Sequence, residues 1–138
     1  MIIVLTTYPT DQNAEEIAKR IVASGLAACV NIIRSEKSVY RWKGQIESNA
    51  EFILLIKTST KAYPKLEAMI KETHPYKVPE IVYLEVKGGE KNYLDWVDGN
   101  SNGISRLLSV PLHWRDTKRA DEPSKELTNA KKPKTLSI

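Results

Sequence analysis

The sequence predicts a single α+β domain whose elements follow the order βαββαβ, which is the split-βαβ plan. Three observations predict it. Short apolar runs with the two-residue period of strands alternate with two segments of helical period. A tight turn joins the two middle strands into a long hairpin, and two prolines separate the second helix from the last strand. A chain of 138 residues fits one such domain.

The first part of the chain is predicted to be strand, helix and strand. The β-branched run at 2–7 is typical of a strand buried on both faces. Helical spacing follows, with Asn13 and Glu16 as an expected capping box. Gly25 then occupies the place of the left-handed residue that ends a helix. The strand after it, beginning at Ala28, alternates its side chains between two faces.

The middle strands form a hairpin around the turn Lys43-Gly44. Each arm has about 14 residues, or roughly 45 Å at about 3.3 Å per residue, whereas a 100-residue domain is roughly 34 Å across. Unless the ribbon bends sharply at 34–38, the tip with Tyr40 and Trp42 must project past the core. Large aromatic side chains on a projecting ribbon need cover from another chain. The hairpin therefore predicts an oligomer, without fixing the number of chains.

The remaining part of the domain is predicted to hold a helix, a rigid connector, a strand and a short closing helix. The buried stripe of the helix is expected to be Leu66, Met69, Ile70 and Thr73. Pro75 and Pro79 fix their own φ and favour extended geometry before them, so the helix should stop at about His74. An apolar strand at 81–86 follows the connector, and the closing helix is predicted from Tyr93, Leu94, Trp96 and Val97.

Charge and composition narrow the classes of function. The net charge is +4, but residues 1–104 hold thirteen basic and thirteen acidic side chains, so the excess lies after residue 104. A neutral domain lacks the excess positive charge that attracts nucleic acid. No apolar run approaches the roughly 20 residues of a membrane span, and the first residues lack the basic region of a signal peptide. With a single cysteine, the chain is expected to be cytoplasmic.

Three segments in this order together resemble the CutA family, the divalent-cation tolerance proteins: AACVNI at 27–32, YRWKGQI at 40–46 and HPYKVPEI at 74–81. The resemblance covers roughly residues 2–97. It implies a ferredoxin-like βαββαβ sandwich with a long projecting hairpin, assembled as a PII-like homotrimer. It also implies an association with copper and other divalent metal ions.

Metal-linked residues of the family pattern would fall at Cys29 and His74, and Glu80 could complete a site. Copper favours thiolate and imidazole ligands. One cysteine and one such histidine cannot make a tetrahedral site in one subunit, so symmetry copies or a carboxylate such as Glu80 would have to add ligands. Two structural alternatives stay open. Cys29 can be a small buried strand residue, and His74 can complete a hydrogen bond at a helix end.

A cleft between subunits is the second candidate site, with Glu51, Lys57, Glu80 and Tyr76 as its expected lining. Glu51 and Lys57 share a strand face but lie about 20 Å apart, so they cannot pair. The alternative is that these charges are simply solvated. The hairpin residues Tyr40, Trp42 and Lys43 are expected at a subunit interface, with a stacking platform for a ligand as the alternative.

These observations lead to one main functional hypothesis and two others. No nucleophile elbow, phosphate-binding loop or clustered His/Cys motif occurs, so a non-enzymatic role is expected. The resemblance implies copper or another divalent ion as the ligand. The main hypothesis is a homotrimer for divalent-metal tolerance. The alternatives are a PII-like module that binds a small effector between subunits, and a trimer that holds a partner protein. Residues 1–104 would form the domain, and 105–138 a basic extension that is partly disordered and dispensable.

Overall fold

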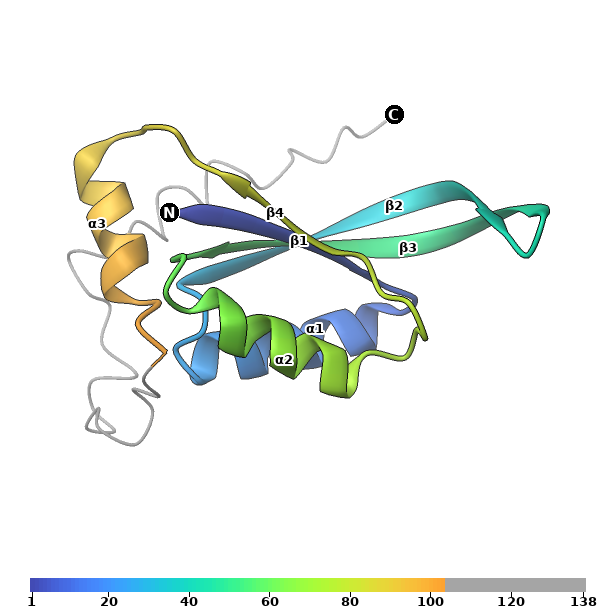
Figure 1. Ribbon diagram of the computed structural model, residues 1–138, viewed down its shortest axis with the longest axis horizontal. Helices are drawn as coiled ribbons and strands as arrows, with labels where there is room; N and C mark the ends of the chain where they lie inside the picture. The colour runs from blue at the N-terminus through green and yellow to red at the C-terminus, as the bar shows by residue number, and fades with distance from the viewer. Residues whose placement is uncertain (104–138) are drawn as a thin grey trace, which may run out of the picture.

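The computed structural model describes residues 1–103, which form four strands and three helices (Figure 1). In chain order these are β1 (Ile2–Tyr8), α1 (Asp11–Ala23), β2 (Cys29–Trp42), β3 (Gln45–Thr58), α2 (Tyr63–Thr73), β4 (Ile81–Glu85) and α3 (Lys91–Gly99). The predicted order βαββαβ with a closing helix is confirmed. The expectations for the extension at 105–138 lie outside the described residues.

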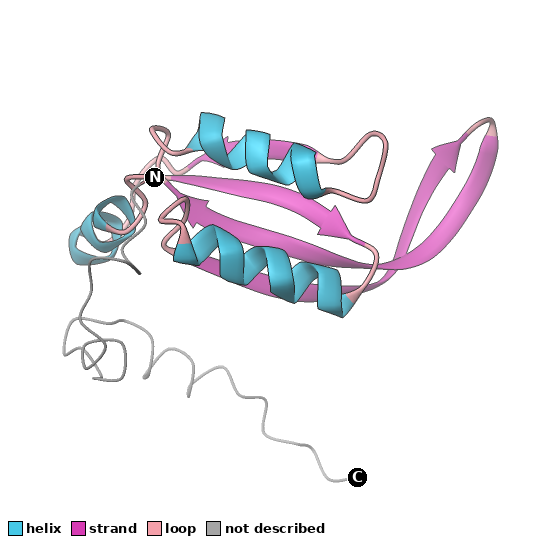
Figure 2. Cartoon of the chain, turned by 90° about the horizontal axis from the view of Figure 1, so that it is seen from below, coloured by secondary structure: helices cyan, strands magenta, loops and turns pink. Residues whose placement is uncertain are grey.

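The four strands form one antiparallel sheet in the order β2-β3-β1-β4. The first strand therefore lies in the middle of the sheet, between the hairpin and the last strand. Val4 is in register with Ile56 on one side and with Tyr83 on the other. This is the ferredoxin-like arrangement that the family resemblance implies, with both long helices on the same face of the sheet (Figures 1 and 2).

The core lies between the sheet and the two long helices. Further apolar side chains pack at its margin and are partly buried. The buried side chains of the core come from both layers and are Ile2, Val4, Tyr8, Ala14, Ile17, Ala18, Ile21, Leu26, Ala27, Leu54, Ile56, Leu66 and Ile70. In β1 the even-numbered residues are buried and the odd-numbered residues are only partly buried. The prediction that this strand is buried on both faces is therefore wrong for the chain by itself, because no element of the described residues covers the second face.

The first helix begins and ends through local backbone chemistry. Thr10 is its N-cap, and the Thr10 hydroxyl accepts a hydrogen bond from the Asn13 backbone N–H at 3.1 Å. The helix thus starts at Asp11, and the predicted capping box of Asn13 and Glu16 is wrong because threonine already satisfies the free N–H. At the other end Gly25 has φ +73°, the left-handed geometry expected of the residue that ends a helix.

The second helix ends where the prolines predict. It covers Tyr63–Thr73, and His74 follows it with extended backbone angles, φ −73° and ψ 132°. Leu66 and Ile70 are fully buried, as expected, but Thr73 is exposed. Its hydroxyl donates a hydrogen bond to the Met69 carbonyl of the preceding helical turn at 2.9 Å.

The hairpin of β2 and β3 extends beyond the helix layer and curves in its outer half (Figures 1 and 2). The register shifts between Ser35 and Ser38, so a bulge lies within 34–38, the segment where a sharp bend would have kept the tip from projecting. The turn residues Lys43 and Gly44 have φ of 49° and 77°. Two successive left-handed residues are what a type I′ turn requires, and this turn matches the natural twist of a hairpin.

The face of the sheet opposite the helices is open, and we call it the open face. Along β3 it carries Ile53 and Leu55, and neighbouring strands add exposed side chains such as Ile33, Val82 and Leu84. The exposed fractions of those three are 47%, 47% and 61%. Within residues 1–103 no helix has the length and hydropathy of a membrane span.

Candidate functional site

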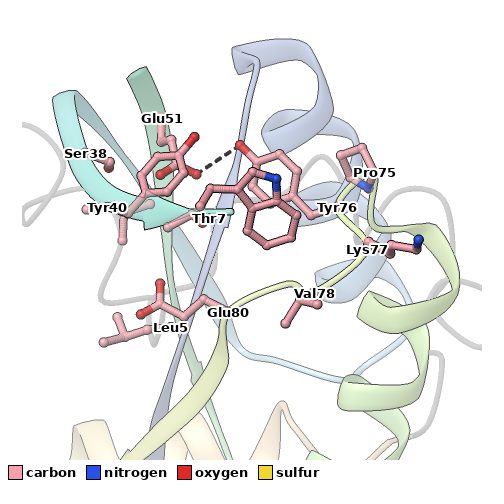
Figure 3. Close-up of a pocket in the computed structure, with 12 residues that line it drawn as sticks. Leu5, Thr7, Ser38, Tyr40, Glu51, Pro75, Tyr76, Lys77, Val78 and Glu80 are labelled. Carbon is pink, nitrogen blue, oxygen red and sulfur yellow. Dashed lines mark hydrogen bonds between the residues drawn. The ribbon is translucent and has the colours of Figure 1, made fainter. Parts of the chain in front are cut away.

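A cavity of about 730 Å³ lies along the open face, between the sheet, the curved hairpin and the connector after α2 (Figure 3). The odd-numbered side chains of β1 and β3 form its floor. Its lining is Leu5, Thr7, Ser38, Tyr40, Trp42, Glu51, Ile53, Pro75, Tyr76, Lys77, Val78 and Glu80. Its volume is in the range of small-molecule sites, about 300–1,000 Å³.

Glu51 is the buried charge of this cavity. It lies on β3 in register with Ser35, directly beside the bulge, and only 8% of it is exposed. The Tyr76 hydroxyl donates a hydrogen bond to Glu51 Oε2 at 3.0 Å (Figure 3). Among residues 1–103 no ion pair joins Glu51 to a cation. A carboxylate removed from water without a cation is energetically costly, so this position calls for a positively charged or hydrogen-bonding partner.

His74 holds Tyr76 in place through a hydrogen bond to its backbone. His74 Nδ1 accepts the Tyr76 backbone N–H at 3.0 Å, and His74 Nε2 lies 2.7 Å from the Thr7 carbonyl oxygen. Because a backbone N–H only donates and a carbonyl only accepts, Nδ1 is unprotonated and Nε2 carries the hydrogen. The imidazole also contacts Tyr8 and Tyr76 in tilted arrangements, with ring centroids 4.3 and 5.0 Å away.

The ionisation of these rings follows from their surroundings. Burial lowers the pKa of His74 below its usual value of 6.5, although the Thr7 carbonyl and the Glu51 charge oppose this effect. Burial also raises the pKa of Tyr76 to about 12, and the hydrogen bond to Glu51 adds to the shift. At neutral pH the His74 imidazole is therefore neutral, and the Tyr76 hydroxyl remains a donor.

The hairpin supplies the other aromatic side chains of the cavity. Tyr40 and Trp42 both lie on β2 and are 40% and 46% exposed. Asn49 Nδ2 donates to the Tyr40 hydroxyl oxygen at 2.7 Å, which ties the ring to the opposite strand. The bulge makes this possible, because it turns the outer half of the hairpin and brings Tyr40 to the same cavity as Tyr76.

The three predicted metal residues do not come together in one subunit. Cys29 is in register with Lys57, which is in register with Ile3, whereas His74 binds the backbone at Thr7. These points on β1 are four residues apart, or about 13 Å at about 3.3 Å per residue. Glu80 lines the cavity, and it directly precedes Ile81, which is in register with Thr6. Within residues 1–103 no three His, Cys, Asp or Glu side chains form a metal-sized group.

The contacts of the two ligand candidates differ. Cys29 is a free, partly buried thiol whose Sγ lies 3.9 Å from Asn31 Oδ1. Both ring nitrogens of His74 already have backbone partners. A metal ion would have to displace one of those hydrogen bonds to reach His74, but it would not have to do so at Cys29.

The structure separates the predicted cleft residues into two groups. Glu51, Glu80 and Tyr76 line one cavity, together with Tyr40 and Trp42. Lys57 lies apart, and its Nζ is 5.8 Å from the centroid of the Tyr93 ring on α3. Lys43 lies in the hairpin turn and does not line the cavity.

Other lining residues were not singled out from the sequence. Leu5, Thr7 and Ile53 share the face of Glu51 through strand parity, so the two-residue period could have identified them. Ser38 had no such signal, because its place depends on the bulge that follows Ser35.

Comparison with known proteins gives one consistent family. Residues 2–100 match the model of the CutA1 divalent ion tolerance protein family. The divalent-cation tolerance protein CutA of Thermus thermophilus is 48% identical over 99 residues, which are 72% of this chain and 96% of that protein. The human protein CutA is 39% identical over 104 residues, which are 75% of this chain and 58% of the human protein.

Solved structures agree with the sequence comparison. The Thermus thermophilus divalent cation tolerance protein aligns with a TM-score of 0.70 and 47% identity, covering 73% of this chain and 99% of the other. A PII-like protein CutA from Nostoc, in its apo form, aligns with a TM-score of 0.71 and 38% identity, covering 75% and 100%. The family match spans every strand and helix of the described fold. This chain therefore belongs to the CutA1 divalent ion tolerance protein family.

Proposed function

We propose that this chain acts as a non-enzymatic homotrimer in divalent-cation tolerance, with copper as the favoured ion. Membership of the CutA1 family over residues 2–100 supports the link to divalent cations. The open face is the single structural observation that supports the assembly of several chains. A sheet face rich in exposed Ile, Val and Leu is stable in water only when another surface covers it.

Closed symmetry gives this surface a natural partner, which is another copy of the chain. The hairpin supports the same proposal, because it carries exposed apolar side chains on both of its faces. Val39, Trp42 and Ile46 are 68%, 46% and 64% exposed. The number three comes from the resemblance to the family, since a surface patch by itself does not fix the number of copies.

Metal binding in this proposal depends on assembly. Within one subunit Cys29 and His74 lie at opposite ends of β1, so they cannot hold the same ion. Cys29 shares the open face with Lys57 and Ile3, by strand parity and register. Symmetry copies can therefore meet there and provide several thiolates, a donor type that copper and zinc prefer. Glu80 and His74 would contribute only where a copy brings a further ligand to them.

Titration calorimetry of the full chain with Cu(II), Cu(I) and Zn(II) tests this proposal. Saturable binding that weakens in Cys29→Ser and in His74→Ala supports it, with His113→Ala as the matched control for loss of an imidazole. Binding should also weaken as pH falls, because thiol and imidazole must lose protons to coordinate. A binding isotherm that is unchanged in both variants would contradict the proposal that Cys29 and His74 are metal ligands.

A second candidate function is the binding of a small effector between subunits, as in a PII-like module. The cavity favours it, because one chain has about 730 Å³ of space lined by aromatic and charged side chains. One related structure, from Nostoc, is described as a PII-like protein CutA. Saturable binding of a small ligand that depends on cavity residues, and not on Cys29, would support this function.

The cytoplasm is the compartment that we propose for this protein. The free thiol of Cys29 is partly exposed, which suits a reducing compartment. One structural relative, from Archaeoglobus fulgidus, is described as periplasmic, so the compartment needs a direct test. Fractionation of native cells with an antibody to the full chain would decide between them.

A further inference from the structure

We propose that the hairpin tip of a neighbouring copy lies against the cavity of the open face, where Lys43 of that copy pairs with Glu51. The inference rests on the assembly proposed above and names a contact that stabilises it. Three observations carry it, namely the buried carboxylate in the cavity, the cations at the hairpin tip and the shapes of the two surfaces.

Glu51 is a carboxylate that one chain buries but does not neutralise. Only 8% of it is exposed, and the Tyr76 hydroxyl donates to one of its oxygens. The ion pairs within residues 1–103 all involve other side chains. A carboxylate has several acceptor positions, so a lysine N–H can bind Glu51 without displacing Tyr76. When copies cover the open face, this charge is stable only with a cation beside it.

Among residues 1–103, no basic side chain of the same chain provides that cation. Lys77 is the basic side chain of the lining, and Figure 3 shows its ammonium group directed away from Tyr40 and Tyr76. Lys57 lies instead beside the Tyr93 ring on α3. A neighbouring copy therefore has to supply the positive charge.

The hairpin tip has the charge that the cavity needs. Residues 39–46 include Arg41 and Lys43 and no acidic residue. Both cations are exposed, and neither takes part in an ion pair within residues 1–103. Lys43 lies in the turn itself, and it does not line the cavity of its own chain. Its position in the turn makes Lys43 the cation best placed to reach another copy.

The shapes of the two surfaces match in a closed ring. The hairpin projects beyond the helix layer, whereas the cavity is a hollow beside the sheet and the connector after α2 (Figures 1 and 3). A projection of one copy that enters a hollow of the next is a heterologous contact, and such contacts form rings when the rotation closes. Each copy then gives one tip and receives one, so every Glu51 is paired.

Urea titration of the full chain, followed by light scattering, tests the proposal. Glu51→Gln keeps an acceptor for the Tyr76 hydroxyl but removes the charge, and Lys43→Gln removes the cation. Each should lower the urea concentration at which the mass falls to one chain by roughly 0.5 M or more. Because the two side chains form one pair, the double variant should lose no more than the worse single variant. Lys65→Gln, exposed on α2, is the matched control and should behave as the unaltered chain does.

The direction of the Glu51→Gln effect separates the alternatives. If no cation pairs with Glu51 in the assembly, the substitution removes an uncompensated buried charge and should raise the urea concentration needed for separation. That result, an unchanged Lys43→Gln variant, or additive losses in the double variant would each overturn the proposal while the assembly stands. A mass of one chain for the unaltered protein without urea would overturn the assembly itself.

Discussion

The two faces of the sheet carry similar apolar side chains but are covered in different ways. Ile2 and Val4 are at most 1% exposed, because α1 and α2 cover their face. Ile3 and Leu5 alternate with them along β1 and are only partly buried. The open face thus also carries apolar side chains, but no helix of residues 1–103 covers it. The difference indicates that the sequence provides for two kinds of burial, one within the chain and one between copies.

Leu54 and Leu55 give the sharpest test of this difference, since they are neighbours on opposite faces of β3. The largest effect is expected from Leu55→Asp, which places a charge on the open face. If copies cover that face, the assembly should separate into single chains, and light scattering should show the lower mass. If the face is free in solution, the mass should not change, and the stability should change by only about 0.5 kcal/mol, as at other surface sites.

Leu54→Ala is the matched variant on the covered face. Leu54 is fully buried, so the variant should lose about 2–5 kcal/mol of unfolding free energy through lost burial and a cavity. The assembly should keep its mass while it melts at a lower temperature. Denaturant titration at fixed protein concentration measures the loss. A small loss at Leu54 would contradict the covered core.

Trp42→Ala extends the comparison to the hairpin. In one chain Trp42 is 46% exposed, so a free hairpin would lose little from its removal. If a neighbouring copy covers the ring, the loss should approach the roughly 3–5 kcal/mol of a buried aromatic. Calorimetric melting together with mass measurement separates the two cases. A melting temperature that stays within a degree or two would show that no copy covers the ring.

The pH dependence of stability is a smaller and more local effect. Burial lowers the pKa of His74 in the folded state below 6.5, so the unfolded chain binds the proton first as pH falls. The stability from His74 is therefore complete above about pH 6.5 and is lost as pH falls from there toward the folded pKa. Melting temperatures at several pH values should show a shallower acid decline in His74→Gln than in the unaltered chain.

His113→Gln is the control for this experiment, because it removes the other histidine of the chain. It should keep the acid decline of the unaltered protein. If the melting temperature declines equally with acid in all three proteins, the claim that His74 is a neutral imidazole with two hydrogen bonds is contradicted.

The smallest effect is expected from deletion of residues 115–138. Their composition is polar and basic, with Pro123 and Pro133, and it offers too little apolar surface to offset the entropy of ordering. The shortened chain should keep the number of chains in its assembly and its melting temperature. A fall of more than several degrees would mean that this segment packs against the domain or against a copy.

The fold could be predicted from the sequence where local patterns decide it. The turn of the hairpin was correctly placed at Lys43-Gly44, and the prolines placed the end of α2 at His74. The N-cap was misplaced because Thr10 and Asn13 are both good capping residues, and only the backbone geometry selects Thr10.

The candidate site was less accessible from the sequence, because its parts come from separate strands and loops. Glu51, Glu80 and Tyr76 were named as a cleft, but nothing local indicated that Lys57 would lie instead by Tyr93. The position of Tyr40 depends on the bulge between Ser35 and Ser38, which a regular alternation does not reveal.

Measurement of the mass of the full chain in solution tests the central claim most directly. The account predicts that the open face and the hairpin are covered by copies in a closed assembly. Light scattering at micromolar concentration should then give three times the chain mass of 15.6 kDa. A mass of one chain under these conditions would contradict the account, since the apolar open face would then be exposed to water.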